Sequence, residues 1–187
     1  MMRSMADLTF STDMIPKSYA PCDIEAGILS RWDEANLGHC EADAEGTPFS
    51  ILIPPPNVTA PLHLGQALNN TLQDVLTRWH RMKGCATLWM PGTDHAGIAT
   101  QTDVEKRLIR QEGKKRTDFS RAEFVSRVQD WKDEYEKTIL GQLRSMGASC
   151  DWQRTRFTMD DVCEAAVREG FFRLFKDGLI YRGKRLV

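Results

Sequence analysis

The sequence predicts an α/β fold in which three parallel strands make up half of a doubly wound domain. Short apolar runs alternate with longer segments of helical periodicity, in the order strand, helix, strand, several helices, strand. That order is typical of a parallel sheet with right-handed crossovers. The composition, 41% hydrophobic and 27% charged, also allows a sizeable buried core.

The N-terminal part is predicted to consist of an extension and one helix, which together span residues 1–46. Residues 1 to about 19 show no clear period and are interpreted as an extended lead-in. Apolar residues recur at helical spacing over residues 22–36, and Pro21 suits the start of a helix. The acidic stretch from Glu41 to Gly46 predicts a solvated connector.

Residues 47–187 contain the predicted sheet. The run from Phe49 to Ile53 predicts a buried strand, which the three following prolines end. A long helix follows and Gly84 is placed to end it, while residues 86–90 predict a second buried strand closed by Pro91 and Gly92. The helix has an apolar face made of Leu64, Leu68, Leu72, Val75, Leu76 and Trp79.

The second half of the chain is predicted to be mainly helical. Helical periodicity covers residues 98–111 and begins again after Ser120, which forms a capping box with Glu123. A further helix is predicted from about Asp160 to Asp177, and residues 179–187 are predicted to form the third strand. Four bulky residues at core spacing are interpreted as packing residues: Trp79, Trp131, Phe171 and Phe175.

Bulk properties exclude several classes of protein. The formal net charge of −1 does not fit a small, strongly basic nucleic-acid-binding module. The five cysteines include no CxxC pair, which argues against a disulfide framework or a zinc ribbon and favours buried thiols in a reducing cytosol. Without a signal peptide or a long apolar run, we expect a soluble, cytoplasmic protein with no membrane contact and no protein-bound metal.

The segment from Ile53 to Asn70 carries the clearest chemical signal. It reads as a strand, a loop, and a helix that opens at His63-Leu64-Gly65-Gln66. A helix N-terminus offers free N–H groups to a phosphate, and ligands of open α/β sheets bind at the carboxyl ends of the strands. His63 and Gln66 are three residues apart, so both can face one ligand. The glycine patterns of dinucleotide-binding folds and P-loops do not occur in the sequence.

These residues resemble a known family. His63-Leu64-Gly65-Gln66 is similar to the HxGH signature of class I aminoacyl-tRNA synthetases. The upstream block Pro54-Pro55-Pro56-Asn57-Val58-Thr59 and the downstream block from Gly92 to Gln101 resemble the valyl enzymes in particular. Further similarity lies in residues 147–152, 156–160 and 178–187.

The resemblance implies that residues 47–187 form the N-terminal half of a Rossmann-like, nucleotide-binding catalytic domain. The implied reaction activates valine with ATP and Mg²⁺ to valyl-adenylate and transfers valine to tRNA(Val). The parent enzyme is expected to be a monomer. An editing insertion, the second half of the sheet and an anticodon-binding domain are expected to follow residue 187. The activity of this part alone is expected to be weak or absent.

The resemblance also assigns candidate site residues. His63 and Gln66 are the candidate catalytic residues, as donors to the phosphates. The candidate ATP-binding residues are Thr59, His63, Gly65 and Gln66. Asp94 is the candidate partner of the valine ammonium group, and Pro54, Pro55 and Asn57 are expected to line the valine site. Structural alternatives stay open, in which His63 caps a helix, Asp94 forms an Asx turn and the prolines only end a strand. His95 has no assigned role.

Two residues depart from the family pattern. Ala60 stands where the family has glycine, and Gln66 stands where it has a second histidine. Glutamine can donate a hydrogen bond but cannot carry the positive charge that strengthens such bonds to phosphate. An alternative is therefore a non-catalytic nucleotide- or partner-binding remnant of the same fold. A different class I nucleotidyl transferase is a third hypothesis, which the block from Gly92 to Gln101 disfavours. The basic residues 114–116 are interpreted as a solvated loop, with contact to tRNA as the alternative.

Overall fold

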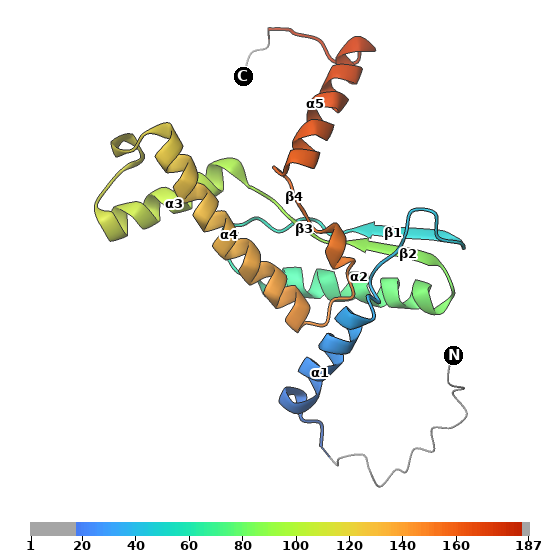
Figure 1. The fold of residues 1–187 in the computed structure, drawn as a ribbon. Helices are drawn as coiled ribbons and strands as arrows, with labels where there is room; N and C mark the ends of the chain where they lie inside the picture. Colours follow the sequence, from blue (N-terminus) through green and yellow to red (C-terminus); the bar gives the residue numbers. More distant parts are fainter. Residues whose placement is uncertain (1–17, 185–187) are drawn as a thin grey trace, which may run out of the picture. The chain divides into compact units, whose positions relative to one another are not determined.

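The computed structural model describes residues 18–184, which divide into two units, residues 18–36 and residues 37–184 (Figure 1). The first unit contains one helix, α1 (Pro21–Glu34), with a proline in its first turn as predicted. The Tyr19 hydroxyl donates to Glu25 Oε1 at 2.9 Å. Most of the predicted lead-in lies outside the described residues, and the predicted domain boundary after residue 46 stays a prediction.

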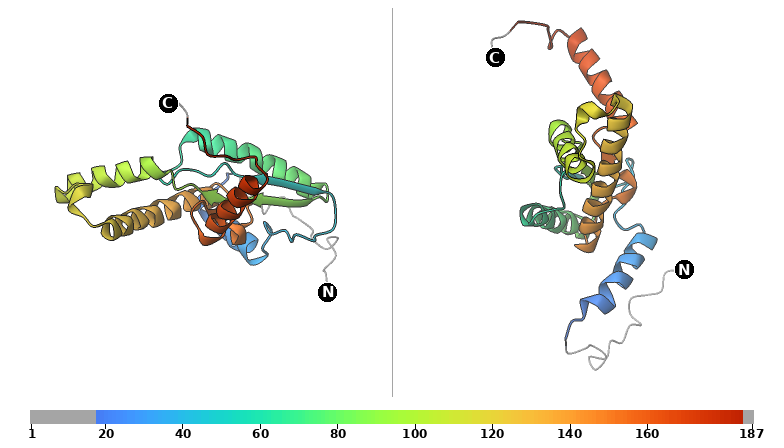
Figure 2. Two further views of the ribbon diagram at one scale, coloured as in Figure 1. Left: turned by 90° about the horizontal axis from the view of Figure 1, so that it is seen from above. Right: turned by 90° about the vertical axis from the view of Figure 1, so that its left-hand side faces the viewer.

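A parallel pair of strands forms the centre of the second unit. β1 (Pro48–Leu52) pairs in parallel with β2 (Ala86–Met90), in a register from Pro48↔Ala86 to Leu52↔Met90. The connection between the two strands is α2 (Leu64–Met82), which packs along one face of the pair in both views (Figures 1 and 2). Both predicted strands and the predicted helix are confirmed in position. The predicted burial is wrong for β1, which has no buried residue, and holds in β2 only for Thr87 and Trp89.

The third parallel segment does not lie where the sequence predicted it. Residues 179–184 form no strand, and residues 185–187 lie outside the described part. Instead β3 (Gly92–Thr93) pairs in parallel with β4 (Arg156–Phe157). A strand of two residues has no detectable period, and its pairing partner, not its composition, makes it a strand.

Backbone hydrogen bonds extend this pairing along the whole segment 86–94. On the side away from β1, Asp151 N donates to Trp89 O at 2.9 Å and Thr158 N to Thr93 O at 3.1 Å. On the β1 side, Ile53 N donates to Met90 O at 3.1 Å. Segment 86–94 is therefore the central strand, with parallel neighbours on both sides.

The remaining helices follow the predicted order. α3 (Gly97–Glu112) and α4 (Arg121–Ser145) lie side by side and are joined through the short helix η3 (Arg116–Asp118) (Figures 1 and 2). Short helix η4 (Trp152–Arg154) precedes β4, and α5 (Asp161–Lys176) follows it. The capping box predicted at the start of α4 is present. Glycines in the left-handed conformation follow α2 and α5, as predicted.

Two apolar clusters form the core of this unit. One joins the central strand, the loop after β1 and the loop after α4 to helix α4 itself. It contains Ile53, Val58, Trp89, Ile139, Leu143, Ala148 and Cys150. The other joins α3 to α4 and contains Val104, Leu108, Phe124 and Trp131. Both clusters include residues of α4, so this helix holds the sheet and α3 together.

The predicted packing of bulky helical residues is correct for Trp131 and wrong for the other three. Trp131 is 8% exposed, whereas Trp79, Phe171 and Phe175 are 51%, 60% and 57% exposed. The predicted apolar face of α2 is also exposed, because this helix buries Asn70 and Thr77 instead. Helical periodicity identifies an apolar face but not its partner. No helix among residues 18–184 is long and apolar enough to cross a membrane.

The cysteines agree with the expected free thiols but only partly with the expected burial. All five are free, and Cys150 is buried, which raises the pKa of its thiol. Cys22 is exposed, and the other three are half-buried. The prediction of buried thiols therefore holds for Cys150 alone.

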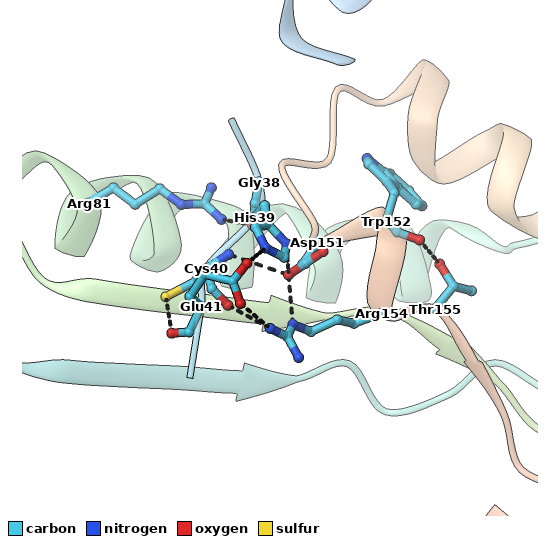
Figure 3. Close-up of polar contacts among 9 residues, drawn as sticks. All are labelled: Gly38, His39, Cys40, Glu41, Arg81, Asp151, Trp152, Arg154 and Thr155. Carbon is cyan, nitrogen blue, oxygen red and sulfur yellow. Dashed lines mark hydrogen bonds and ion pairs between the residues drawn. The ribbon is translucent and has the colours of Figure 1, made fainter. Parts of the chain in front are cut away.

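A group of charged side chains fixes the connector before β1 to the segment around η4 (Figure 3). The buried carboxylate of Asp151 lies 3.0 Å from His39 Nδ1 and 3.0 Å from Arg154 Nε. The other nitrogen of the His39 ring lies 2.8 Å from Glu41 Oε1, and Glu41 also pairs with Arg154 at 3.6 Å. The connector predicted to be solvated is thus held at its first acidic residue.

The two carboxylates change the proton affinity of the histidine between them. The hydrogen bond to Glu41, followed by that to Asp151, raises the pKa of His39. The same contact lowers the pKa of Glu41. The pair is therefore most favourable when His39 is protonated and Glu41 is ionised.

We expect the stability that His39 contributes to depend on pH. Because its pKa is raised in the folded state, the contribution is complete below the ordinary value of about 6.5 and is lost as pH rises through the raised value. Urea unfolding of the wild type and of His39→Gln should differ most at low pH and converge at high pH. A difference that does not change with pH would contradict this assignment.

We expect Gly92→Ala to destabilise the fold. A Cβ atom at this position would lie 2.8 Å from the backbone oxygen of Arg156, so β4 would have to move away. The expected loss is about 1–3 kcal/mol of unfolding free energy, measured by urea denaturation. The matched control is Gly141→Ala in α4, where a Cβ meets nothing within 4 Å and should stabilise by about 0.5–1 kcal/mol.

Candidate active site

His63 and Gln66 form a reciprocal cap at the start of α2. His63 is the N-cap residue, and its Nδ1 accepts a hydrogen bond from the backbone N–H of Gln66 at 3.3 Å. The side-chain oxygen of Gln66 accepts in return from the backbone N–H of His63 at 3.0 Å. Together they satisfy two backbone donors of the first turn.

The cap leaves one donor on each side chain unused by these contacts. Because Nδ1 of His63 accepts, the ring proton of the neutral imidazole lies on Nε2. Because the oxygen of Gln66 accepts, its NH₂ group stays able to donate. The helix-cap alternative for His63 therefore describes the geometry, while its role toward a phosphate stays a prediction.

Gly65 leaves room for the His63 ring in this cap. A Cβ atom here would lie 3.1 and 3.2 Å from ring atoms of His63, so glycine leaves room for the capping ring. A hollow of about 1160 Å³ opens beside this turn, between the start of α2 and α4. His63 and Gly65 line it on one side, and Lys137 and Gln142 on the other.

Helix α4 anchors the loop that leads into this turn at two points. The Trp131 indole Nε1 donates to Val58 O at 2.8 Å within the core. The backbone N–H of Leu62 donates to Gln142 Oε1 at 2.8 Å. These bonds fix both ends of residues 58–62, so the approach to His63 is set by packing on α4.

The two loops that carry the candidate valine-binding residues are joined by their backbones. Asp94 N donates to Pro56 O at 2.8 Å, and Val58 N donates to Asp94 O at 3.0 Å, which makes Asn57 and Asp94 bridge partners. Pro54 and Pro55 lie just upstream on the same loop and are exposed. The structure therefore brings Asn57 and Asp94 together, while their role toward valine stays a prediction.

The Asp94 carboxylate is held by two donors and keeps free capacity. Its Oδ2 accepts from the Ala96 backbone N–H at 3.0 Å, which is the Asx turn that the sequence left open, and its Oδ1 accepts from the Thr158 hydroxyl at 2.9 Å. The side chain is 30% exposed. No lysine or arginine of residues 18–184 lies within ion-pair distance of it. Such a carboxylate can accept hydrogen bonds from an ammonium group.

The turn after Asp94 is strained. Ala96 has a φ of 46° and a ψ of 32°, a left-handed conformation that favours glycine. For a residue with a Cβ atom this costs of the order of 1 kcal/mol, and such strain often lies at functional sites. The strained residue is the one whose N–H holds the Asp94 carboxylate, so the strain and the fixed carboxylate belong together.

Thr158 was not predicted as a site residue from the sequence. This residue lies within the run 156–160 that is similar to the family, but nothing in the run itself indicates a role for it. The parallel register of β3 and β4, in which Thr93 faces Phe157, places Thr158 opposite Asp94. Only knowledge of that register could have identified it.

Two other predicted features lie elsewhere or need no special conformation. Thr59 lines a separate depression with Arg107 and Trp131, and does not line the hollow beside His63. Ala60 does not have a positive φ, because among the non-glycine residues of 18–184 only Asn36 and Ala96 do. Alanine is therefore accommodated where the family has glycine. The described part of the chain contains no group of three metal-ligating side chains.

A family model described as tRNA synthetases class I (I, L, M and V) matches residues 27–187. The chain belongs to the class I tRNA synthetase family. The LeuRS of Agrobacterium radiobacter K84, solved in a ternary complex with tRNA and LeuAMS, has a similar fold. That similarity has a TM-score of 0.71 at 20% identity and covers 89% of this chain and 19% of the LeuRS chain.

Within the class I synthetases, this chain is similar to several valine–tRNA ligases, which confirms the resemblance seen in the motifs. A valine–tRNA ligase of Rhodopirellula baltica is 55% identical over 173 residues, which are 92% of this chain and 17% of that enzyme. One of Syntrophotalea carbinolica is also 55% identical, over 92% of this chain and 19% of its own length. The chain spans about a fifth of the length of these curated relatives.

We expect the cap at His63 to contribute measurably to the stability of this synthetase segment. His63→Ala removes the acceptor for Gln66 N and should lower the unfolding free energy by about 1 kcal/mol. His63→Asn keeps a side-chain acceptor at the N-cap and should unfold at nearly the wild-type urea concentration. Equal losses in both variants would show that the histidine ring matters for packing and not as a cap.

Proposed function

We propose that this chain carries the N-terminal part of the active site of an ATP-dependent valine–tRNA ligase. The enzyme would activate valine as valyl-adenylate and then transfer it to tRNA(Val). The observation that carries the proposal is the backbone pairing of Asn57 with Asp94, on the loop that continues to His63. The relatives named valine–tRNA ligases, at 55% identity, support the choice of amino acid.

On the nucleotide side, His63 and Gln66 supply N–H donors to the phosphates of ATP. Both side chains are oriented by the cap, so their remaining N–H groups need no reorganisation when a ligand binds. The N-terminal end of α2 adds its helix dipole. Lys137 lines the adjacent hollow and adds a positive charge at its edge. The metal ion enters with the nucleotide as MgATP, and the described residues need not hold it.

On the amino-acid side, Asp94 accepts hydrogen bonds from the ammonium group of valine. Asn57 lies beside it through the backbone bridge, and Pro54 and Pro55 contribute apolar surface on the same loop. The reaction itself is attack of the valine carboxylate on the α-phosphate of ATP. Catalysis of such a step consists mainly of alignment and neutralisation of charge on phosphate oxygens.

Gln66 and Ala60 are the features that favour a non-catalytic remnant. Gln66 cannot carry a positive charge, which removes the stronger, charge-assisted bond to phosphate. Both residues nevertheless fit their surroundings, because Gln66 completes the cap and Ala60 needs no left-handed backbone. We therefore favour a catalytic parent in which glutamine replaces histidine as a neutral donor.

The test is a chimera in which this chain replaces the 173 matching residues of the Rhodopirellula baltica relative. We expect it to catalyse valine-dependent exchange of pyrophosphate into ATP. His63→Asn keeps the cap but loses the Nε2 donor, and should lower the rate by roughly tenfold to a thousandfold. The control is Arg168→Ala on α5, an exposed residue that pairs with Glu164 one turn earlier, which should leave the rate unchanged.

Two outcomes contradict the proposal in different ways. A chimera that is folded, binds tRNA(Val) and yet forms no valyl-adenylate would support the non-catalytic alternative. An active chimera whose His63→Asn variant retains the full rate would show that His63 is only a helix cap. The variant Gln66→Glu tests the role of Gln66 separately from that of His63. It keeps the cap but places a negative charge near the phosphates, which should weaken MgATP binding.

A further inference from the structure

The hydroxyl oxygen of Thr158 has three polar neighbours from the adjacent loop. It donates to Asp94 Oδ1 at 2.9 Å and accepts from the His95 backbone N–H at 3.0 Å. The third neighbour is the His95 ring atom Nδ1, at 2.7 Å. One oxygen thus contacts both Asp94 and His95 in the turn after β3.

The single proton of the Thr158 hydroxyl determines the direction of its hydrogen bond with His95 Nδ1. A threonine hydroxyl has one proton and two lone pairs. An ionised carboxylate can only accept, so the proton of Thr158 points to Asp94. One lone pair accepts the backbone N–H of His95, and the remaining lone pair faces Nδ1. Two lone pairs would repel at this distance, so the His95 proton lies on Nδ1.

The fold supplies this arrangement through its strands. Thr158 N donates to Thr93 O and thereby continues the β3–β4 register by one residue. The glycine at position 92 allows the close approach of β4. The His95 ring also makes an edge-to-face contact with the ring of Phe157, at an interplanar angle of 87° and with the centroids 6.5 Å apart. The hydroxyl and the ring are therefore held independently of the bond between them.

We propose that Thr158 is a positioning residue of the amino-acid site, which fixes the Asp94 carboxylate and holds His95 as the Nδ1–H tautomer with Nε2 as a free acceptor. The inference rests on the proposed role of Asp94 as the partner of the valine ammonium group. Without the hydroxyl, Asp94 keeps only the bond from Ala96 N, and the His95 ring loses the acceptor that selects its tautomer.

The consequence for the ligand is a site that presents acceptors and no competing cation. The Nδ1–H tautomer adds no positive charge beside Asp94, although its Nδ1 lies only 3.5 Å from Asp94 Oδ1. The ammonium group of an amino acid is then the cation that completes the site. The geometry distinguishes an α-amino acid from a carboxylic acid of the same shape that lacks the amine.

The first measurement tests the tautomer on the 187-residue chain itself. Nitrogen-15 NMR of the His95 ring at a pH of about 8, where histidine is neutral, reports which nitrogen carries the proton. We expect Nδ1–H in the wild type and in Thr158→Ser, and a shift toward Nε2–H in Thr158→Val. The matched control is Thr155→Val, which removes a hydroxyl bonded to Trp152 O in the same segment and should leave His95 unchanged.

The second measurement tests the positioning role, with valine as the ligand and 3-methylbutanoate as the probe that lacks the amine. Valine should shift the NMR signals of Asp94 and His95, and 3-methylbutanoate should not. Thr158→Val should raise the Kd for valine by roughly threefold to tenfold, and Thr158→Ser should restore it. Melting curves of each variant confirm that the chain is folded.

Each outcome decides one part of the inference. An Nε2–H tautomer in the wild type, or the same tautomer in Thr158→Val, overturns the assigned hydrogen bonds. The expected tautomers with an unchanged Kd in Thr158→Val overturn the positioning role alone. If valine does not shift the wild-type signals at all, the proposed role of Asp94 fails and the positioning role fails with it, while the tautomer assignment stands.

Discussion

The candidate site depends on two backbone hydrogen bonds of Asp94, one to Pro56 O and one from Val58 N, at 2.8 and 3.0 Å. They form beyond the ends of β1 and β2, where the last residue of the central segment 86–94 meets the loop that follows β1. Because parallel neighbours are held by bonds of regular spacing, these two contacts set Asn57 against Asp94 before any side chain contributes. The backbone of Asp94 is therefore fixed, and the side-chain rotamer alone then determines where its carboxylate lies.

Helix α4 connects the loop of residues 58–62 to the buried core. Ile139 and Leu143 of α4 are fully buried against the sheet, while Trp131 and Gln142 of the same helix bond the loop at Val58 and Leu62. The two polar anchors lie roughly three turns apart on one rigid helix. The free energy of apolar burial therefore offsets the cost of ordering the loop, because the polar contacts alone would be too weak to order it. This is why the approach to His63 is fixed although its side chain is exposed.

The sequence predicted those parts of the structure that depend on local signals. The strand–loop–helix segment that contains His63 and the cap at Ser120 depend on neighbours in the sequence, and both were predicted correctly. The third strand was misplaced because β4 has only two residues and exists through its register with β3. Thr158 was missed for the same reason, since 64 residues separate it from Asp94. The exposure of Trp79 could not be predicted, because periodicity does not reveal what covers a face.

Structural and ligand-binding interpretations of the same residue do not exclude each other at this site. The cap uses one nitrogen of His63 and one atom of the Gln66 amide, and each side chain keeps its other polar atom. Asp94 likewise gives one acceptor position of each oxygen to the protein and keeps the others. A side chain that is already held in place loses less conformational entropy when a ligand binds. The cap and the Asx turn are therefore the means by which the exposed donors and acceptors keep a fixed direction, and the strain at Ala96 is the cost of that order.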